Sequence, residues 1–157
     1  MELRKIDDKN LWDIISLSVH EHQKKFVATN TKSILEAYVT ITSSGVALPF
    51  GLYEEDTLVG FVMIGYGTYE DNEPQVAPNE YCIWRFMIDK EHQGKGYGKK
   101  AMKAALEYIY TFPCGPATYC WLAYEPENDV AKKLYASFGF EENGDMCGDE
   151  IVAVRKL

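Results

Sequence analysis

The chain is 157 residues long, with 46% hydrophobic and 25% charged residues and a formal net charge of −8 at pH 7. This composition is typical of a soluble globular protein and excludes disordered, collagen-like and coiled-coil chains. The negative charge disfavours nucleic acid or an anionic membrane as a partner, and no apolar run reaches the roughly 18–20 residues of a membrane span. We therefore expect a single domain over residues 1–157, in the cytoplasm and without a signal peptide.

The first part of the chain is expected to hold one strand and two helices. Residues 2–6 fit a short strand, and Asn10–Phe26 carries apolar residues at helical spacing. A second helix is expected to run to about Thr42, because Ser33 and Glu36 have the spacing of a capping box at its start.

The middle of the chain is rich in strand patterns. Ala47–Tyr53 and Leu58–Tyr69 flank a short acidic turn and predict a hairpin, and the polar segment Glu70–Asn79 predicts a loop. Tyr81–Asp89 is an apolar run interrupted by Arg85, which suits a central strand buried on both faces.

The last third predicts two helices and three more strands. They are a helix over Lys99–Tyr110, a strand over Ala117–Tyr124, a helix from Asn128 or Asp129 to Ser137, and a hairpin of Phe140–Met146 and Glu150–Leu157. The order βααβββαβαββ is an α/β (α+β) mixture with a mostly antiparallel central sheet, flanked by helices and containing one strand–helix–strand crossover. Cys82 and Cys120 fall inside apolar runs and are expected to be buried free thiols.

Three glycines follow the predicted central strand and precede a helix. Gly94, Gly96 and Gly98 occupy alternate positions, and such a loop can direct backbone N–H groups and a helix N-terminus at a phosphate. The surrounding segment Lys90–Lys103 holds five Lys and one Glu, a local charge of +4, and leaves −12 for the rest of the chain. These lysines alone also fit an ordinary solvated helix face. Neither a Walker A nor a Rossmann glycine pattern matches the spacing.

The string Gln93-Gly94-Lys95-Gly96-Tyr97-Gly98 resembles the coenzyme A pyrophosphate loop of the GNAT superfamily of N-acetyltransferases. Asn128, Tyr135 and the pair Gly139-Phe140 stand at that family's spacing, so that the resemblance covers about residues 58–157. The strings 26–30 and 85–89 are similar to bacterial spermine/spermidine acetyltransferases within it.

This resemblance implies an acetyl-CoA-dependent N-acetyltransferase in which the amine attacks the thioester directly in a ternary complex. It implies that Tyr135 protonates the departing sulfur, and that Asn128 contacts the cofactor arm. Acetyl-CoA as cosubstrate would be held by the following residues: Phe86, Met87, Ile88, Gln93, Gly94, Lys95, Gly96, Tyr97, Gly98, Lys99 and Asn128. The implied acceptor is a small cationic amine, in particular a polyamine. No metal is expected, and a homodimer is left open.

Each of these roles has a structural alternative. Tyr135 also fits the core face of an amphipathic helix, and Asn128 also fits a helix cap. Gln93 also fits a cap on the loop's own backbone, and Lys95 and Lys99 also fit surface charges. The acceptor is open as well, between a polyamine, an antibiotic amine and a protein N-terminus, and a non-catalytic acyl-CoA-binding module is the alternative to an enzyme.

The general base is not assigned by the sequence. Some polyamine acetyltransferases carry a Glu on the central strand, but Trp84 stands at that register here. Glu54, Glu55 and Glu80 are nearby acids that could act through a water molecule. The alternative is that the small neutral fraction of free amine binds directly, without a base. Aromatic residues such as Trp84 and Trp121 fit either a cation–π wall for the amine or the core.

Overall fold

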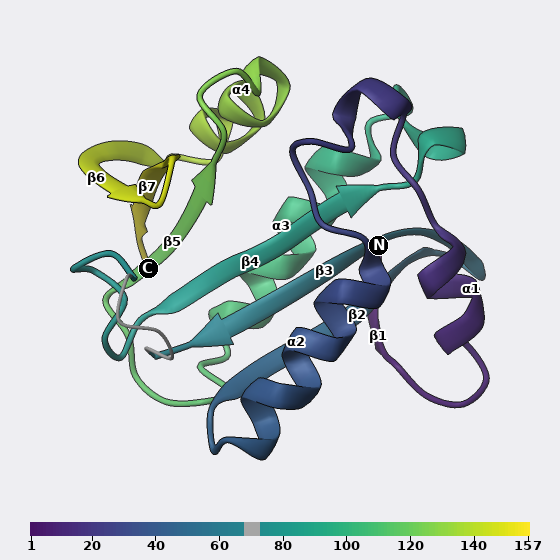
Figure 1. Ribbon diagram of the computed structural model, residues 1–157, viewed down its shortest axis with the longest axis horizontal. Coiled ribbons are helices and arrows are strands. Elements are labelled where there is room, and N and C mark those ends of the chain that lie inside the picture. Colours follow the sequence, from purple (N-terminus) through teal and green to yellow (C-terminus); the bar gives the residue numbers. More distant parts are fainter. Residues whose placement is uncertain (68–72) are drawn as a thin grey trace.

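Seven strands form one sheet in the order β1-β2-β3-β4-β5-β7-β6 (Figure 1). This computed structural model describes residues 1–67 and 73–157. β4 and β5 run parallel, and the other neighbouring strands run antiparallel. The strands are β1 Glu2–Lys5, β2 Val46–Glu54, β3 Thr57–Tyr66, β4 Tyr81–Ile88, β5 Tyr119–Tyr124, β6 Glu141–Cys147 and β7 Glu150–Lys156. The mostly antiparallel sheet with one crossover, expected from the sequence, is confirmed.

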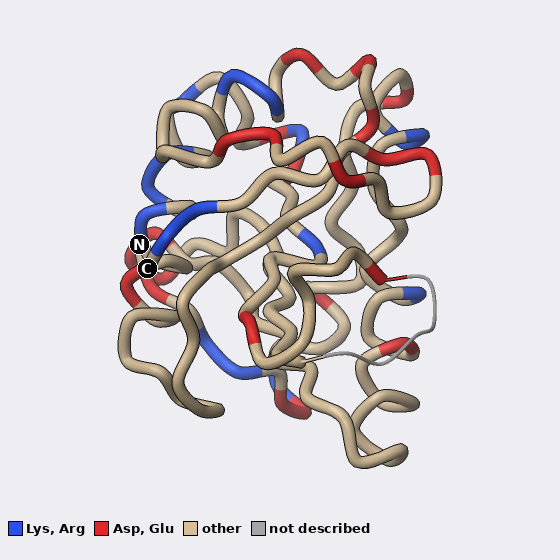
Figure 2. Tube along the Cα trace, turned by 90° about the vertical axis from the view of Figure 1, so that its left-hand side faces the viewer, with Lys and Arg blue, Asp and Glu red and all other residues tan. Residues whose placement is uncertain are grey.

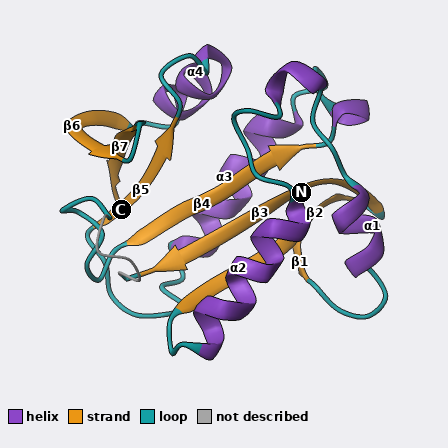
Figure 3. Ribbon diagram, viewed as in Figure 1, coloured by secondary structure: helices purple, strands orange, loops and turns teal. Residues whose placement is uncertain are grey.

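Helices cover both faces of this sheet (Figure 3). They are α1 Leu11–Ser16, α2 Asn30–Thr42, α3 Tyr97–Ile109 and α4 Asp129–Ser137, with 3₁₀ turns η1 Glu21–Gln23 and η2 Lys90–His92. None of the helices in residues 1–67 and 73–157 combines the length and the apolar character that a membrane crossing requires.

Strand β3 shows why both faces are covered. Phe61 and Met63 pack into a buried cluster with residues of α1 and α2, whereas Val62 and Ile64 pack into the cluster built with α3. Successive side chains of a strand point to opposite faces, so an uninterrupted apolar run requires a helix layer on each side. α1 and α2 therefore lie on one face, and α3 on the other.

The predicted first helix is shorter than its apolar spacing suggested, and the prediction of one helix over 10–26 is wrong. α1 ends at Ser16, because Leu17 adopts an extended ψ of 144°. The next residue is held by the sheet: the N–H of Ser18 donates to Asp89 Oδ1 at 2.9 Å, and its carbonyl accepts from the N–H of Lys90 at 2.8 Å. These two bonds to the end of β4 replace helical bonds in this segment.

The second helix begins four residues before the predicted start. Its cap is Thr29, whose Oγ1 accepts the N–H of Lys32 at 3.2 Å. Ser33 lies inside the first turns, where its Oγ donates to the carbonyl of Thr29 at 3.1 Å. The capping box predicted from Ser33 and Glu36 is therefore wrong, and Glu36 instead faces the sheet, where it pairs with Arg85.

The remaining elements follow the sequence patterns with shifted ends. α3 begins at Tyr97, two residues before the predicted Lys99, and β5 begins at Tyr119 rather than Ala117. Residues 68 and 69 of the predicted third strand, and the first residues of the following predicted loop, lie outside the described residues. Cys82 and Cys120 are buried and free, as expected.

Candidate cofactor and acceptor site

The parallel strands β4 and β5 separate soon after they pair. Their register contains Tyr81 with Cys120 and Cys82 with Trp121. Two residues later β4 carries a bulge: Ile83 pairs with Ile64 and Arg85 with Met63 on β3, which leaves Trp84 as the extra residue. A bulge bends and twists its strand, and the rest of β4 diverges from β5 (Figure 1).

This divergence exposes the middle of β4, which the sequence predicted to be buried on both faces. Trp84, Arg85 and Phe86 are only half-buried, so that prediction is wrong for the centre of the strand. The cause is the loss of β5 as a neighbour. Over Phe86–Ile88, β4 keeps β3 as its partner on one edge and presents its other edge to the gap.

A cleft of about 690 Å³ fills the gap between β4 and β5. Its volume lies in the range of pockets that hold small molecules and cofactors. It is lined by Gln93, Gly94, Gly96, Tyr97 and Gly98 of the glycine loop. It is also lined by residues of β4, β5, α4 with its cap, and the β6–β7 hairpin, among them Ile83, Trp84, Arg85, Phe86, Met87, Ile88, Trp121, Ala123, Asn128, Tyr135, Cys147 and Glu150. The structure thus brings most of the sequence-predicted site residues to one cleft.

The glycine loop has the backbone that an anion site needs. Gly94 and Gly96 have φ angles of +76° and +80°, a left-handed conformation that costs other residues about 1 kcal/mol or more. Gly96 is the N-cap of α3, and its carbonyl accepts the N–H of Lys100 at 3.4 Å. The N–H groups of the first helical turn have no carbonyl one turn earlier to bind, and the helix dipole adds partial positive charge there.

The side chains of this loop are held by the protein. The Gln93 amide exchanges hydrogen bonds with the Gln23 amide at 2.9 and 3.1 Å, and its Nε2 also donates to the Ile88 carbonyl at 3.0 Å. The ammonium group of Lys95 donates to the Glu91 carbonyl at 2.8 Å, and Lys99 is exposed. Gln93 therefore does cap backbone near its own loop, the alternative that the sequence left open.

Two residues that the sequence did not single out fix the loop to the N-terminal segment. Buried Asp89 accepts the N–H of Ser18 with one oxygen and the N–H of Glu91, at 3.0 Å, with the other. Gln23 forms the reciprocal amide pair with Gln93. An acid at a strand end, and a Gln that lies 70 residues before Gln93, carry no pattern that would have identified either role.

Tyr135 stands on α4 and is 9% exposed. Its ring packs against those of Tyr124 and Phe140, with centroids 5.7 and 6.2 Å apart. Burial raises the pKa of Tyr135 well above its usual value of 10, and the charge of Glu150 raises it further. The phenol is therefore protonated at neutral pH and can act as a proton donor.

Asn128 precedes α4 and caps it. Its Oδ1 accepts the N–H of Ala131 at 3.2 Å. The amide nitrogen of the same side chain can still serve a ligand, since Asn128 also lines the cleft. Both sequence interpretations of this residue are therefore compatible with its position.

The cleft lining also contains aromatic and charged side chains. They are Trp84 and Trp121, the acids Glu36, Glu73 and Glu150, and the basic residues Lys24, Lys25, Lys32 and Arg85. Glu36 is already paired, because its Oε2 lies 2.9 Å from an Arg85 nitrogen. Acidic residues are also distributed over the rest of the described trace rather than gathered in one block (Figure 2).

The sequence left Glu54, Glu55 and Glu80 open as candidate general bases, and the structure shows where each of them lies. Glu54 binds Lys100 and the chain's amino terminus. Glu80 accepts the N–H groups of Thr118 and Tyr119 at 2.8 and 2.6 Å. Glu55 lies in the β2–β3 turn with a φ of +55°.

Known proteins share both the sequence pattern and the fold. A sequence model described as "Acetyltransferase (GNAT) family" matches residues 9–140. Spermine/spermidine N(1)-acetyltransferase of Bacillus subtilis (strain 168) is 31% identical over 159 residues, covering 100% of this chain and 99% of the relative. A probable spermine N(1)-acetyltransferase of Bacillus subtilis subsp. natto (strain BEST195) is 32% identical, with the same coverage.

Solved structures of acetyltransferases have the same fold. An aminoglycoside acetyltransferase in complex with coenzyme A aligns with a TM-score of 0.78 at 19% identity, over 98% of this chain and 93% of that one. The PaiA N-acetyltransferase of Thermoplasma acidophilum, also in complex with coenzyme A, aligns with a TM-score of 0.67 at 19% identity, over 99% and 98%.

Fold and sequence together define an acyltransferase of the N-acetylating class. The chain belongs to the acetyltransferase (GNAT) family, as the glycine loop and the Asn/Tyr spacing predicted, and it is an acetyl-CoA-dependent N-acetyltransferase acting on amines.

Proposed function

We propose that this enzyme transfers the acetyl group of acetyl-CoA to a primary amine of a polyamine such as spermine or spermidine. The observation that carries the proposal is a single cleft whose lining includes the glycine loop, the buried phenol of Tyr135, and acidic and aromatic side chains. The names of the Bacillus relatives support the same acceptor.

Coenzyme A fits the cleft by its chemistry. We assign the diphosphate to the N–H groups of residues 94–99 with Lys95 and Lys99 near it, and the pantetheine arm to the open edge of β4 at Phe86, Met87 and Ile88. Gln93 would support this loop through its bonds to Gln23 and Ile88, rather than by a charge of its own. Asn128 would offer its amide nitrogen to the arm.

Catalysis has three chemical requirements at the reacting end. An alkylammonium group, with a pKa near that of Lys at about 10.4, must lose a proton before it can attack. The oxyanion that forms on the thioester carbonyl needs a donor, for which we assign backbone N–H groups of β4. The departing sulfur needs a proton, which we assign to the hydroxyl of Tyr135.

Direct transfer from thioester to amine is the route we propose. Cys82 lines the cleft, but burial raises the pKa of its thiol to about 12, so it is not a thiolate at neutral pH and is a poor nucleophile. An acetylated Cys82 intermediate is therefore not part of the proposed mechanism.

The acceptor end suits a long cation with several charges. Trp84 and Trp121 line the cleft, and aromatic rings attract ammonium groups, although the Arg85 guanidinium already lies 5.6 Å from the centroid of the Trp84 ring. Glu36 of α2 and Glu150 of β7 add carboxylates to the lining. An aminoglycoside or a protein N-terminus presents the same reacting group, and rates with matched acceptors separate these candidates.

The test is a thiol-release assay with acetyl-CoA and spermine, spermidine, lysine and an aminoglycoside at matched concentrations. We expect kcat/KM to be highest for the two polyamines. A higher kcat/KM for the aminoglycoside or for lysine would replace the polyamine with that acceptor class, and turnover with none of these amines would overturn the proposal.

The remaining assignments concern the whole chain. We infer that residues 1–157 form one N-acetyltransferase domain, because β1 to β7 belong to one sheet. We infer a cytoplasmic location, supported by four free cysteines, which are typical of a reducing compartment. A homodimer stays a prediction, which analytical ultracentrifugation would test.

A further inference from the structure

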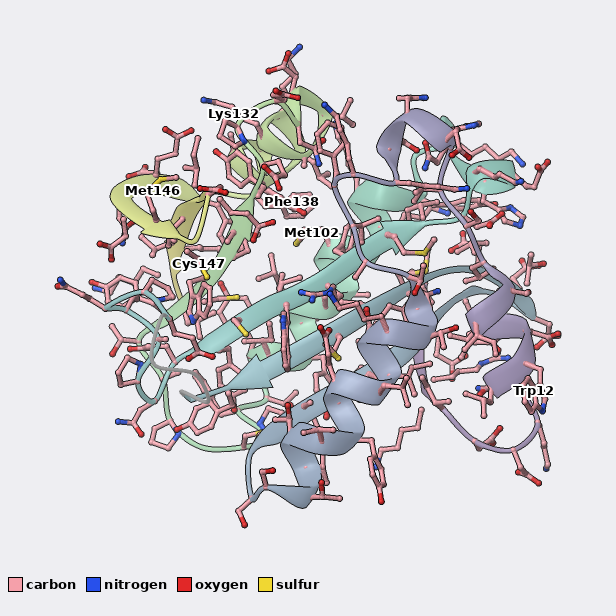
Figure 4. The ribbon with its side chains drawn as sticks, in the orientation of Figure 1. Trp12, Met102, Lys132, Phe138, Met146 and Cys147 are labelled. Atoms are coloured by element: carbon pink, nitrogen blue, oxygen red, sulfur yellow. The ribbon has the colours of Figure 1, made fainter. Side chains whose placement is uncertain are left out.

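The β6–β7 hairpin places an acid beside the end of β5, the strand from which β4 diverges. Glu150 is the first residue of β7, and its register partner is Cys147. The next residue, Ile151, pairs with Tyr124 at the end of β5. Glu150 therefore lies beside the end of β5 and opposite Cys147 in the hairpin; Cys147 is labelled in Figure 4.

Glu150 is a carboxylate inside the cleft without a protein partner. It is half-buried and lines the same cleft as Tyr135. No ion pair or hydrogen bond joins its side chain to residues 1–67 or 73–157, whereas Glu36 pairs with Arg85 and Glu142 pairs with Lys132. An unpaired carboxylate at a partly desolvated position is costly, and a cationic ligand would relieve that cost.

The charged groups around Glu150 come from several elements. Burial is the largest cause that raises its pKa above the usual 4.5; the charge of Glu125, after β5, raises it further, and that of Arg85, on β4, lowers it. Tyr135, on α4, is close enough to Glu150 that the carboxylate charge contributes to the raised pKa of the Tyr135 phenol. Glu150 is thus more basic than an exposed Glu and lies within electrostatic reach of the phenol.

We propose that Glu150 is the catalytic carboxylate that binds the attacking ammonium group and removes its proton. This inference rests on the proposed function, and it names the base that the sequence left unassigned. The cleft supplies the geometry, because Glu150 and Tyr135 both line it. In this assignment Glu150 faces the amine and Tyr135 faces the sulfur of the thioester.

The proton balance closes with these two groups. Glu150 takes one proton from R–NH₃⁺, and the free amine forms the C–N bond to the thioester carbonyl carbon. The C–S bond then breaks, and the sulfur receives the phenolic proton of Tyr135. The phenolate recovers a proton from the acylated nitrogen through water, and the Glu150 carboxyl releases its proton to solvent. One amide, one thiol and one proton result.

The decisive variant is Glu150→Gln, with Asp149→Asn as its matched control. Asp149 is the neighbouring exposed acid in the hairpin turn and does not line the cleft. At pH 7 we expect Glu150→Gln to lower kcat/KM for spermine by about 100-fold or more and to leave the calorimetric affinity for coenzyme A unchanged. Asp149→Asn should keep wild-type kinetics.

The pH profile separates a base from a merely structural acid. Without the carboxylate, the Glu150→Gln variant depends on free amine in solution, so its log(kcat/KM) should rise by one for each pH unit up to the amine pKa. The ratio of wild-type to variant kcat/KM should therefore shrink at high pH. A uniform deficit at all pH values would overturn the proton-transfer role, and a kcat/KM within threefold of wild type would overturn the proposal altogether.

Two further measurements keep the outcome unambiguous. Glu150→Asp retains a carboxylate at a shorter reach and should recover part of the wild-type kcat/KM. Equal losses of kcat/KM in the Asp and Gln variants would contradict the proposal, even if the Gln variant folds poorly. The proposed function fails separately, if the wild-type enzyme acetylates no polyamine; the same variants are then compared with whichever amine the wild type accepts.

Discussion

Replacing Tyr135 by Phe removes one hydroxyl group from the middle of the cleft. The ring contacts with Tyr124 and Phe140, at centroid distances of 5.7 and 6.2 Å, remain available to Phe. No hydrogen bond of the phenol to the described residues is lost, since none is formed. The substitution therefore tests chemistry with little structural perturbation.

The expected magnitudes for kinetics and stability differ sharply. General acid catalysis contributes roughly 10²–10⁴-fold, so kcat should fall at least about 100-fold, equivalent to about 2.7 kcal/mol of activation free energy. The free energy of unfolding should change by no more than about 0.5 kcal/mol, because packing is kept and no partnered group is orphaned.

Steady-state kinetics with spermine, calorimetry with coenzyme A and thermal melting measure these quantities on the same samples. Tyr108→Phe is the matched control, because Tyr108 packs on Phe50 outside the cleft and should keep wild-type kcat. If Tyr135→Phe retains its rate, or if coenzyme A affinity falls in step with turnover, then Tyr135 is a packing residue and the acid role is refuted.

Three other variants test the loop and the cleft. Gly96→Ala should lose about 1 kcal/mol of stability and bind coenzyme A more weakly, because its φ of +80° disfavours a side chain. The control Gly144→Ala, with a φ of +86° in the β6–β7 hairpin, should lose stability but keep its affinity for coenzyme A. Equal losses of coenzyme A affinity in the two variants would contradict a loop-specific effect. Gln93→Ala should lower the free energy of unfolding by about 1–2 kcal/mol in denaturant titrations through the bonds to Gln23 and Ile88, and an unchanged midpoint would mean that these bonds contribute nothing. Since burial raises the pKa of Glu150 above 4.5, its ionisation opposes folding above that pH; Glu150→Gln should therefore melt higher than wild type at pH 7, and the difference should disappear near pH 4.

The parts of the fold that local patterns determine were predictable. The alternating apolar residues of β3, the amphipathic α3 and the turn glycine Gly148 all act within a few residues of chain. The turn at the glycine loop was predictable for the same reason, because glycine tolerates the left-handed backbone that Gly94 and Gly96 adopt.

Features set by distant parts of the chain were not predictable. The segment after α1 is extended because Asp89, at the end of β4, binds the N–H of Ser18. Exposure in the middle of β4 follows from the bulge at Trp84, which depends on the register with β3. The position of Glu150 depends on β7 lying between β5 and β6, an order that no local pattern contains.

The central claim is that coenzyme A lies in the gap between β4 and β5, with its diphosphate on the turn before α3. Backbone amide NMR chemical shifts recorded during titration with coenzyme A test it most directly. Pantetheine, which lacks the diphosphate, is the comparison ligand. The account predicts that coenzyme A moves the amide signals of residues 94–99 together with those of 86–88, and that pantetheine moves the second group alone. Shifts that leave 94–99 untouched at saturating coenzyme A would contradict it.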